Sequence, residues 1–269
     1  MSYEIRQYGI EPLFVPYPGA HPVAVRKGRE LEIAYLAHDH DAGNPLDDQD
    51  GMGHIYTCFR GAPAKELENF RQALGLDEDG DPSDQIRPNP NAVPLDCFRH
   101  GIEVWSISGE GTQCQWDTGR RVGVWVPDSC LLEEVDRRRR VYAFGKTVRE
   151  QNGWSAKIEG KEKSPSFRTW GEAFGWLEQA IARHWLAFPT KEQAAQGRRK
   201  ACSELAREAL EQYNGWLRGD CYRLIQESFT WKHRWKRESH EVTSGLVGLE
   251  YALEELNEIK GFLTVRRAA

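Results

Sequence analysis

The stretch that decides the fold is Cys114-Gln115-Trp116-Asp117-Thr118-Gly119-Arg120-Arg121-Val122-Gly123-Val124-Trp125-Val126. Its first half is polar and typical of a turn, and its second half alternates apolar residues as a β-strand does. Short strands and loops are predicted before this stretch, and mainly helices are predicted after it. Within it, we expect Asp117 to form the turn and Trp116 to fill the core.

Composition indicates an ordinary globular protein. The 269 residues leave room for one large domain or two small ones. With 39% hydrophobic residues and 10 Trp, the chain can bury a sizeable core, which excludes the disordered class. The formal net charge of −5 argues against a dedicated nucleic-acid-binding protein, and it is too small for a mimic of DNA.

Apolar runs and cysteines predict a cytoplasmic protein with no membrane partner. No run reaches the 18 or more apolar residues that a membrane span needs, and the first residues lack the basic and apolar regions of a signal peptide. The 6 Cys form no C-x-x-C pair and no zinc-ligand spacing. We therefore expect reduced thiols.

Alternating residues predict the strands before the opening stretch, at 22–25, 31–36, 54–59 and 102–107. Residues 62–74 predict a short helix. Two segments rich in Asp, Pro, Gly and Asn, 38–51 and 77–94, predict loops.

After the opening stretch, the four basic residues Arg137, Arg138, Arg139 and Arg140 mark the expected start of an inserted unit. The turn sequence Gln151-Asn152-Gly153 predicts a hairpin of residues 141–148 and 154–158. A helix at 170–188 completes a ββα unit. Further helices are predicted at 194–214 and 246–263, with a strand at 220–226 between them.

These elements predict an α+β protein. A single, mostly antiparallel sheet is expected from residues 22–36, 54–59, 102–108, 122–126 and 220–226, with the two C-terminal helices packed on one face. The main domain would comprise residues 1–136 and 191–269. The inserted ββα unit would occupy residues 137–190.

Several motifs resemble an uncharacterised family of proteins carried by phages, plasmids and integrative elements. They are Trp116-Asp117-Thr118 followed by Val122-Gly123, and Tyr213-Asn214-Gly215-Trp216-Leu217-Arg218-Gly219-Asp220-Cys221-Tyr222. The acidic segment 38–51, Arg99-His100-Gly101-Ile102 and a helix start near Gly245 accompany them. The chain departs from the family pattern by one extra residue after Thr118, by Asn214 in place of Asp, and by the ββα insertion. The resemblance implies an accessory protein of a mobile genetic element that binds a host protein or protein–nucleic-acid complex, as a counter-defence factor of anti-restriction or anti-CRISPR type does.

The acidic segment offers one candidate site, for a divalent cation. Asp39, Asp41, Asp47 and Asp50 fall at positions 1, 3, 9 and 12 of a calcium-loop count. Asn44 at position 6 and the lack of Glu at position 12 depart from that pattern, so a solvated acidic loop is the alternative. No other cofactor is indicated.

His100 and Asp117 form a second candidate, because a carboxylate beside an imidazole makes an acid–base or metal-binding pair. Asp220 could add a carboxylate, although a role in ending the preceding helix is the favoured explanation. A metal-dependent hydrolase or nuclease would combine these three residues with Asp41, Asp48 or Asp50. The chain contains no P-loop, Rossmann fingerprint, H-E-x-x-H or kinase motif, so enzyme activity is not predicted.

Two basic segments suggest direct contact with nucleic acid. Residues 231–237 interleave aromatic rings that stack on bases with cations that contact phosphate. The alternative is that Trp231 and Trp235 lie in the core and the charges are solvated. The nucleic-acid interpretation rests on Arg137, Arg138, Arg139, Arg140, Trp231, Lys232, Arg234, Lys236 and Arg237.

Overall fold

The computed structural model describes residue 5 and residues 7–48, 50–59, 61–158, 163–183 and 189–268. The chain forms two compact units: residues 1–48 with 211–269, and residues 49–210. Each contains antiparallel strands with helices packed on them, which confirms the α+β class. The boundaries differ from the predicted ones, and the segment 137–190 lies inside the second unit.

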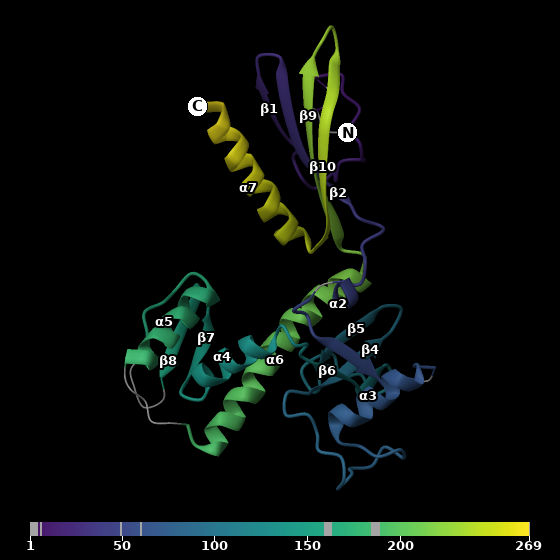
Figure 1. Ribbon diagram of the computed structural model, residues 1–269, viewed down its shortest axis with the longest axis vertical. Helices are drawn as coiled ribbons and strands as arrows, with labels where there is room; N and C mark the ends of the chain where they lie inside the picture. The colour runs from purple at the N-terminus through teal and green to yellow at the C-terminus, as the bar shows by residue number, and fades with distance from the viewer. Residues whose placement is uncertain are drawn as a thin grey trace. The chain divides into compact units, whose positions relative to one another are not determined.

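The first unit contains a four-stranded antiparallel sheet in the order β1-β2-β9-β10. Its strands are β1 (Val23–Lys27), β2 (Glu30–His38), β9 (Cys221–Trp231) and β10 (Trp235–Val247) (Figure 1). The predicted strands at 22–25, 31–36 and 220–226 are confirmed. The basic, aromatic segment after residue 228 forms the end of a long hairpin.

Both faces of this sheet are covered. Helix α7 (Leu249–Ala268) packs Ala252 and Leu256 against Leu36, Leu224 and Leu246 on one face. The N-terminal segment packs on the other face, where the buried residues are Ile5, Ile10, Leu31, Ile33, Tyr35, Ala37, Ile225 and Phe229. Each fully buried large aliphatic side chain contributes about 1.5–3 kcal/mol. Burial on both faces explains why residues 33–37 of β2 are all hydrophobic and buried.

Helix α6 (Lys191–Leu217) confirms and extends the helix predicted at 194–214, and the boundary between the units falls within it. Gly219 ends it with φ of 70°, a conformation that favours glycine. Gly215, also expected to end the helix, lies inside it. A Cβ on Gly215 would come within 2.4 Å of Val247 Cγ1, so close packing against β10 requires glycine there.

The second unit contains a sheet in the order β3-β6-β4-β5, also antiparallel. Its strands are β3 (His54–Thr57), β4 (Val93–Arg99), β5 (Glu103–Ile107) and β6 (Thr118–Val126). Helix α3 (Ala64–Leu74) packs Phe70 and Ala73 on Val124 of β6. The opening stretch thus forms a turn followed by a central strand, as predicted. Strand β4 was not predicted, because Pro94 and Asp96 interrupt its apolar pattern.

The prediction of a single sheet is wrong. Residues 22–36 and 220–226 lie in one sheet, and residues 54–57, 103–107 and 122–126 lie in the other. The alternation of apolar and polar residues along a strand predicts which side chains are buried, but it does not predict which other strand pairs with that strand. Pairing partners are set by contacts that are distant in the sequence.

A hairpin–helix arrangement occupies the rest of the second unit. The predicted hairpin is confirmed as β7 (Gly145–Glu150) and β8 (Gly153–Ile158), and α5 (Trp170–Arg183) packs Phe174 and Leu177 on it. The predicted continuation of this helix over 184–188 lies outside the described residues. The four arginines do not mark a boundary, because they lie inside helix α4 (Leu132–Tyr142). Asp128 stabilises the start of that helix, since its Oδ1 accepts a hydrogen bond from the Leu131 N–H at 3.0 Å.

Candidate functional site

The acidic segment is partly built into the first unit. Asp39 is buried, and its carboxylate pairs with Arg223 of β9 and accepts a 3.0 Å hydrogen bond from the Gly245 N–H. Asp47, in the short helix α2 (Pro45–Asp48), accepts a hydrogen bond from Asn44 at 2.8 Å. The side chain of Asp48 lies outside the described part of the structure.

No metal-ligand set gathers in this segment. In the described residues, no group of three or more His, Cys, Asp or Glu side chains could hold a metal ion. Arg223 already neutralises Asp39, and Asp50 belongs to the second unit rather than the first. Metal binding by the segment therefore stays a prediction without an assembled site.

His100 and Asp117 do meet. His100 Nδ1 lies 3.2 Å from Asp117 Oδ2, and the Cys114 thiol lies 3.4 Å from the same oxygen. The His100 side chain is 75% exposed, and an exposed pair of this kind contributes little to stability and has no desolvated surroundings for catalysis. Asp220, the third predicted member, belongs to the other unit and accepts a backbone hydrogen bond from Gly248 through its carbonyl.

Trp116 is not a core residue, and that prediction is wrong. Its side chain is 86% exposed, whereas Trp125 is fully buried and donates from Nε1 to the Met52 carbonyl at 2.9 Å. Trp116 lies in the turn before β6, where alternation does not apply. The strand periodicity that starts at Val122 selects Trp125 instead.

Most of the four arginines of α4 form ion pairs within the protein. Arg138 is buried, and it bonds to Glu134 at 2.6 Å and Glu208 at 2.7 Å. Arg137 pairs with Glu134 and Glu178, and Arg139 pairs with Asp136. Of these four arginines, Arg140 alone forms no ion pair with any described residue. Neutralised guanidinium groups of this kind attract phosphate weakly, so this part of the predicted nucleic-acid surface has little free charge.

A separate basic surface lies at one end of the first sheet, where the β1–β2 and β9–β10 turns lie side by side (Figure 1). The Trp231 N–H donates to the Arg29 carbonyl at 2.7 Å and joins the two turns. We call this surface the basic end. It comprises Arg26, Lys27, Arg29, Trp231, Lys232, His233, Arg234, Trp235 and Lys236.

Most cations of the basic end are free. In the part of the chain that the structure describes, Lys27, Arg29, Arg234 and Lys236 are exposed and form no ion pair. Lys232 lies 3.9 Å from Glu238. Arg237, which was predicted with this group, pairs instead with the buried Glu227 and is half-buried.

The two tryptophans at this end differ in burial. Trp235 packs on the first-unit core and on Tyr8, with ring centroids 6.1 Å apart. Trp231 is 40% exposed and packs edge-on against Trp235 at 5.3 Å. Trp235 thus holds the Trp231 ring in place at the surface. The sequence predicted the residues of this hairpin, but it gave no sign that Arg26, Lys27 and Arg29 would join them.

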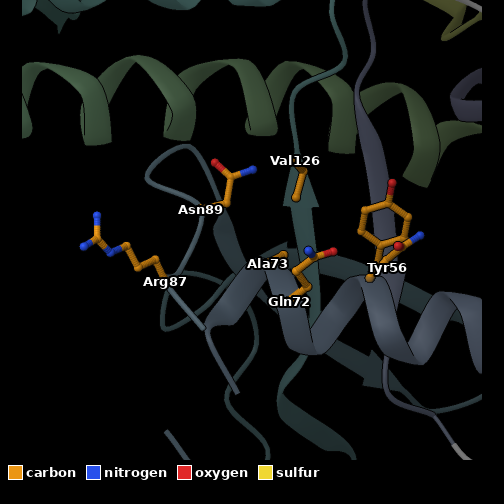
Figure 2. Close-up of a pocket in the computed structure, with 7 residues that line it drawn as sticks. Tyr56, Gln72, Ala73, Arg87, Asn89 and Val126 are labelled. Atoms are coloured by element: carbon orange, nitrogen blue, oxygen red, sulfur yellow. The ribbon is translucent and has the colours of Figure 1, made fainter. Parts of the chain in front are cut away.

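A pocket of about 360 Å³ opens in the second unit (Figure 2). Its walls come from β3, α3, β6 and the loop before β4, which was predicted only as a long loop. It is lined by Tyr56, Asn69, Gln72, Ala73, Arg87, Asn89 and Val126. The sequence gives no sign of this site, because its residues lie far apart in the chain, from Tyr56 to Val126, and match no motif.

Cysteine chemistry plays no visible part in these sites. All 6 cysteines are free thiols. Burial raises the pKa of Cys97 and of Cys202 to about 11, so both stay protonated and unreactive near neutral pH.

Asp96 of β4 is a buried carboxylate that the sequence did not single out. It accepts hydrogen bonds from the Gly109 and Arg121 N–H groups, each at 2.8 Å, and from Gln113 at 3.1 Å. Burial opposes its ionisation, but these donors outweigh burial and lower the pKa of Asp96 below its ordinary value. Arg121 has φ of 51°, so Asp96 holds a strained backbone turn at the start of the buried part of β6.

We expect the second unit to lose stability in acid through Asp96. A lowered pKa in the folded state means that the ionised carboxylate stabilises the fold above its unfolded pKa of about 3.9, and that this stabilisation is lost as the pH falls below about 4. Asp96→Asn should lower the free energy of unfolding by about 2 kcal/mol at neutral pH. It should also make that free energy depend less on pH in the acid range, which we call the acid limb of the stability curve. Urea unfolding at several pH values measures both, with the exposed Asp84→Asn as the control. An unchanged acid limb in Asp96→Asn would contradict this role.

Comparison of the chain with protein-family models, with curated proteins and with solved structures finds no match. Every helix in the described residues is too short or too polar to cross a membrane.

Proposed function

We propose that this protein binds single-stranded nucleic acid through the basic end of its first unit. The observation that carries the proposal is an exposed Trp231 ring fixed among exposed cations, of which Lys27, Arg29, Arg234 and Lys236 form no ion pair within the described part of the chain. Cations that track the phosphate backbone and aromatic rings that stack on bases are the two parts of a single-strand-binding surface.

Local charge supports this function despite the net charge of −5. Six Lys and Arg side chains are exposed at the basic end, namely Arg26, Lys27, Arg29, Lys232, Arg234 and Lys236. Within the described segments 26–30 and 231–238, the exposed acidic residues are Glu30 and Glu238. Phosphate attraction depends on this local field within about 10 Å rather than on the charge of the whole chain. The acidic residues elsewhere therefore do not prevent binding.

The exposed ring favours unpaired bases over a duplex. Stacked base pairs hide their faces, whereas an unpaired base offers its face to an aromatic side chain. Trp231 is also held from behind by Trp235, so little rotational freedom is lost when a base stacks on it.

The roles that the family resemblance implies stay predictions. An accessory protein of a mobile genetic element, acting as a counter-defence factor on a host protein or protein–nucleic-acid complex, is compatible with a nucleic-acid surface. The metal-dependent hydrolase with His100 and Asp117 is also a prediction, and it would require residues from both units.

Fluorescence anisotropy of the full chain with a labelled single-stranded 20-mer tests the proposal. We expect binding at low salt, with an association constant that falls linearly on a log–log salt plot. A duplex of the same sequence should bind more weakly. Lys232→Glu/Arg234→Glu/Lys236→Glu should abolish binding, whereas Lys65→Glu/Lys191→Glu/Arg199→Glu makes the same change in net charge elsewhere and should keep it.

Three results would overturn the proposal. They are no binding at low salt, equal loss in both triple variants, and capture by anionic lipid vesicles but not by the 20-mer. The last result would assign the basic end to a membrane surface instead, because Trp and Lys also suit a lipid interface.

A further inference from the structure

We infer that the pocket of the second unit binds a nucleobase, carried either by a free nucleotide or by an unpaired position of a strand. The pocket belongs to a different unit from the basic end, and the inference goes beyond the proposed function and does not rest on it. It is carried by polar side chains that converge on the pocket with their hydrogen-bonding groups unused.

The lining has a definite chemistry. Asn69 and Gln72 of α3 and Asn89 of the loop before β4 bring three carboxamides to the pocket, and Tyr56 of β3 brings a phenol. Ala73 and Val126 supply its apolar part. The lining contains no carboxylate, and Arg87 is its one charged residue.

These groups are available to a ligand. Within the described residues, the side chains of Asn69, Gln72 and Arg87 and the Tyr56 hydroxyl form no hydrogen bond or ion pair. Asn89 uses its Oδ1 to accept from the Asn91 N–H at 2.9 Å, which leaves its Nδ2 as a donor. A polar pocket in which most side-chain donors and acceptors are unused by the fold, with Asn89 Oδ1 as the exception, is suited to a ligand that satisfies them.

The pocket is also held in shape. The Asn89 N–H donates to the Ala73 carbonyl at 3.0 Å, and the Ser83 N–H donates to the Gly75 carbonyl at 2.9 Å, so the long loop is tied to α3. Tyr56 packs part of its ring on the Phe70–Ala73–Val124 cluster. A preformed site loses less entropy on binding than a mobile loop would.

Carboxamides match the edges of a nucleobase. Each presents a donor and an acceptor side by side, which is the arrangement that Asn and Gln use when they read adenine. The half-buried Tyr56 ring offers an aromatic wall for a planar ligand. In Figure 2, Arg87 and Tyr56 lie at opposite sides of the pocket with Gln72 and Asn89 between them, and the Arg87 side chain points away from Tyr56.

Isothermal titration calorimetry of the full chain tests this inference. The probes are AMP, GMP, CMP and UMP, ribose 5-phosphate as a ligand without a base, and tetranucleotides of one base. We expect at least one mononucleotide to bind and ribose 5-phosphate to bind at least about tenfold more weakly, because stacking and base-edge contacts would be missing. Asn69→Leu/Gln72→Leu should weaken binding about tenfold or more.

Two control variants test whether the effect is specific to the pocket. Gln85→Leu makes the same kind of change at an exposed loop position outside the pocket and should leave affinity unchanged. Lys232→Glu/Arg234→Glu/Lys236→Glu should also keep mononucleotide binding, so failure of the basic end and failure of the pocket can be told apart. Thermal unfolding confirms that each variant is folded.

The inference would be overturned by no heat of binding from any nucleotide up to about 10 mM, by ribose 5-phosphate binding as tightly as the nucleotides, or by affinity that Asn69→Leu/Gln72→Leu does not change. A tetranucleotide that binds at least tenfold more tightly than its mononucleotide would support a base in a strand. Equal affinities would support a free nucleotide.

Discussion

Replacing Glu227 with Ala should lower the free energy of unfolding by about 3 kcal/mol, toward the lower end of the range for breaking a buried ion pair. The Glu227 side chain is 1% exposed in the middle of β9, and it pairs with Arg237 of β10. Its Oε2 also accepts hydrogen bonds from the Tyr35 hydroxyl at 2.9 Å and from the Leu13 N–H at 3.4 Å. The substitution would leave three donors without an acceptor inside the first unit.

The physical reason is that removing one partner of a buried ion pair costs more stability than removing both partners. An unpaired buried charge keeps its desolvation cost but loses the attraction that offset it. Arg237 is 33% exposed, so water can partly solvate it, and this is why we expect the lower end of the range. Burial and the nearby Glu227 carboxylate also raise the pKa of Tyr35, so its hydroxyl stays a donor throughout the neutral range.

Denaturant unfolding measures this effect, and a double variant tests its cause. Glu227→Leu/Arg237→Met removes both charges and should recover most of the lost stability, because an apolar pair of similar volume avoids the unpaired charge. Glu241→Ala, at an exposed position of β10, should change stability by less than about 0.5 kcal/mol. A double variant no more stable than Glu227→Ala would show that the pair is not the cause.

Trp231→Ala should weaken single-strand binding by about 5- to 150-fold and leave its salt dependence unchanged. Stacking is a short-range contact that releases no counterions, whereas each lysine or arginine on phosphate contributes about 0.7 to the log–log salt slope. Lys232→Gln/Arg234→Gln/Lys236→Gln should therefore reduce that slope by about 2. The two variants separate the two parts of the proposed surface.

Anisotropy titrations at four or more salt concentrations give both quantities. Trp231→Phe keeps an aromatic face and should retain most of the affinity. Trp116→Ala removes a more exposed tryptophan from the second unit and should have no effect on binding at the basic end. A Trp231→Ala protein that binds as tightly as the parent would remove the stacking contact from the proposal. A slope unchanged by the three Gln substitutions would remove the phosphate contacts.

Local pattern was enough for most individual elements. The turn before β6, the β7–β8 hairpin at Asn152-Gly153 and the helix start at Asp128 each depend on residues within a few positions of one another. Strand β4 was missed because Asp96 is polar and Pro94 is a strand breaker. The buried Asp96 carboxylate accepts hydrogen bonds from the N–H groups of Gly109 and Arg121, which no local pattern could indicate.

The candidate sites were harder to predict for the same reason. His100 and Asp117 were a candidate pair whose contact the sequence left open, and the structure brings them together from the β4–β5 turn and the loop that leads into β6. The acidic segment was a candidate cation site with a solvated loop as the alternative, but Arg223 of β9, far along the chain, neutralises Asp39. The basic run of α4 was expected to be free, but Glu178 and Glu208 lie beside it in the fold.

The sequence by itself determined the α+β class, the strand periodicity of residues 122–126, the hairpins and the helices, because backbone geometry follows short-range spacing and turn chemistry. Only the tertiary structure decided that the strands divide between two sheets, that Trp125 rather than Trp116 is buried, and which charges remain free. These depend on pairing between residues more than a hundred positions apart, such as Ala34 with Gln226. The free energy of such pairing comes from contacts and desolvation that exist only once the chain has folded.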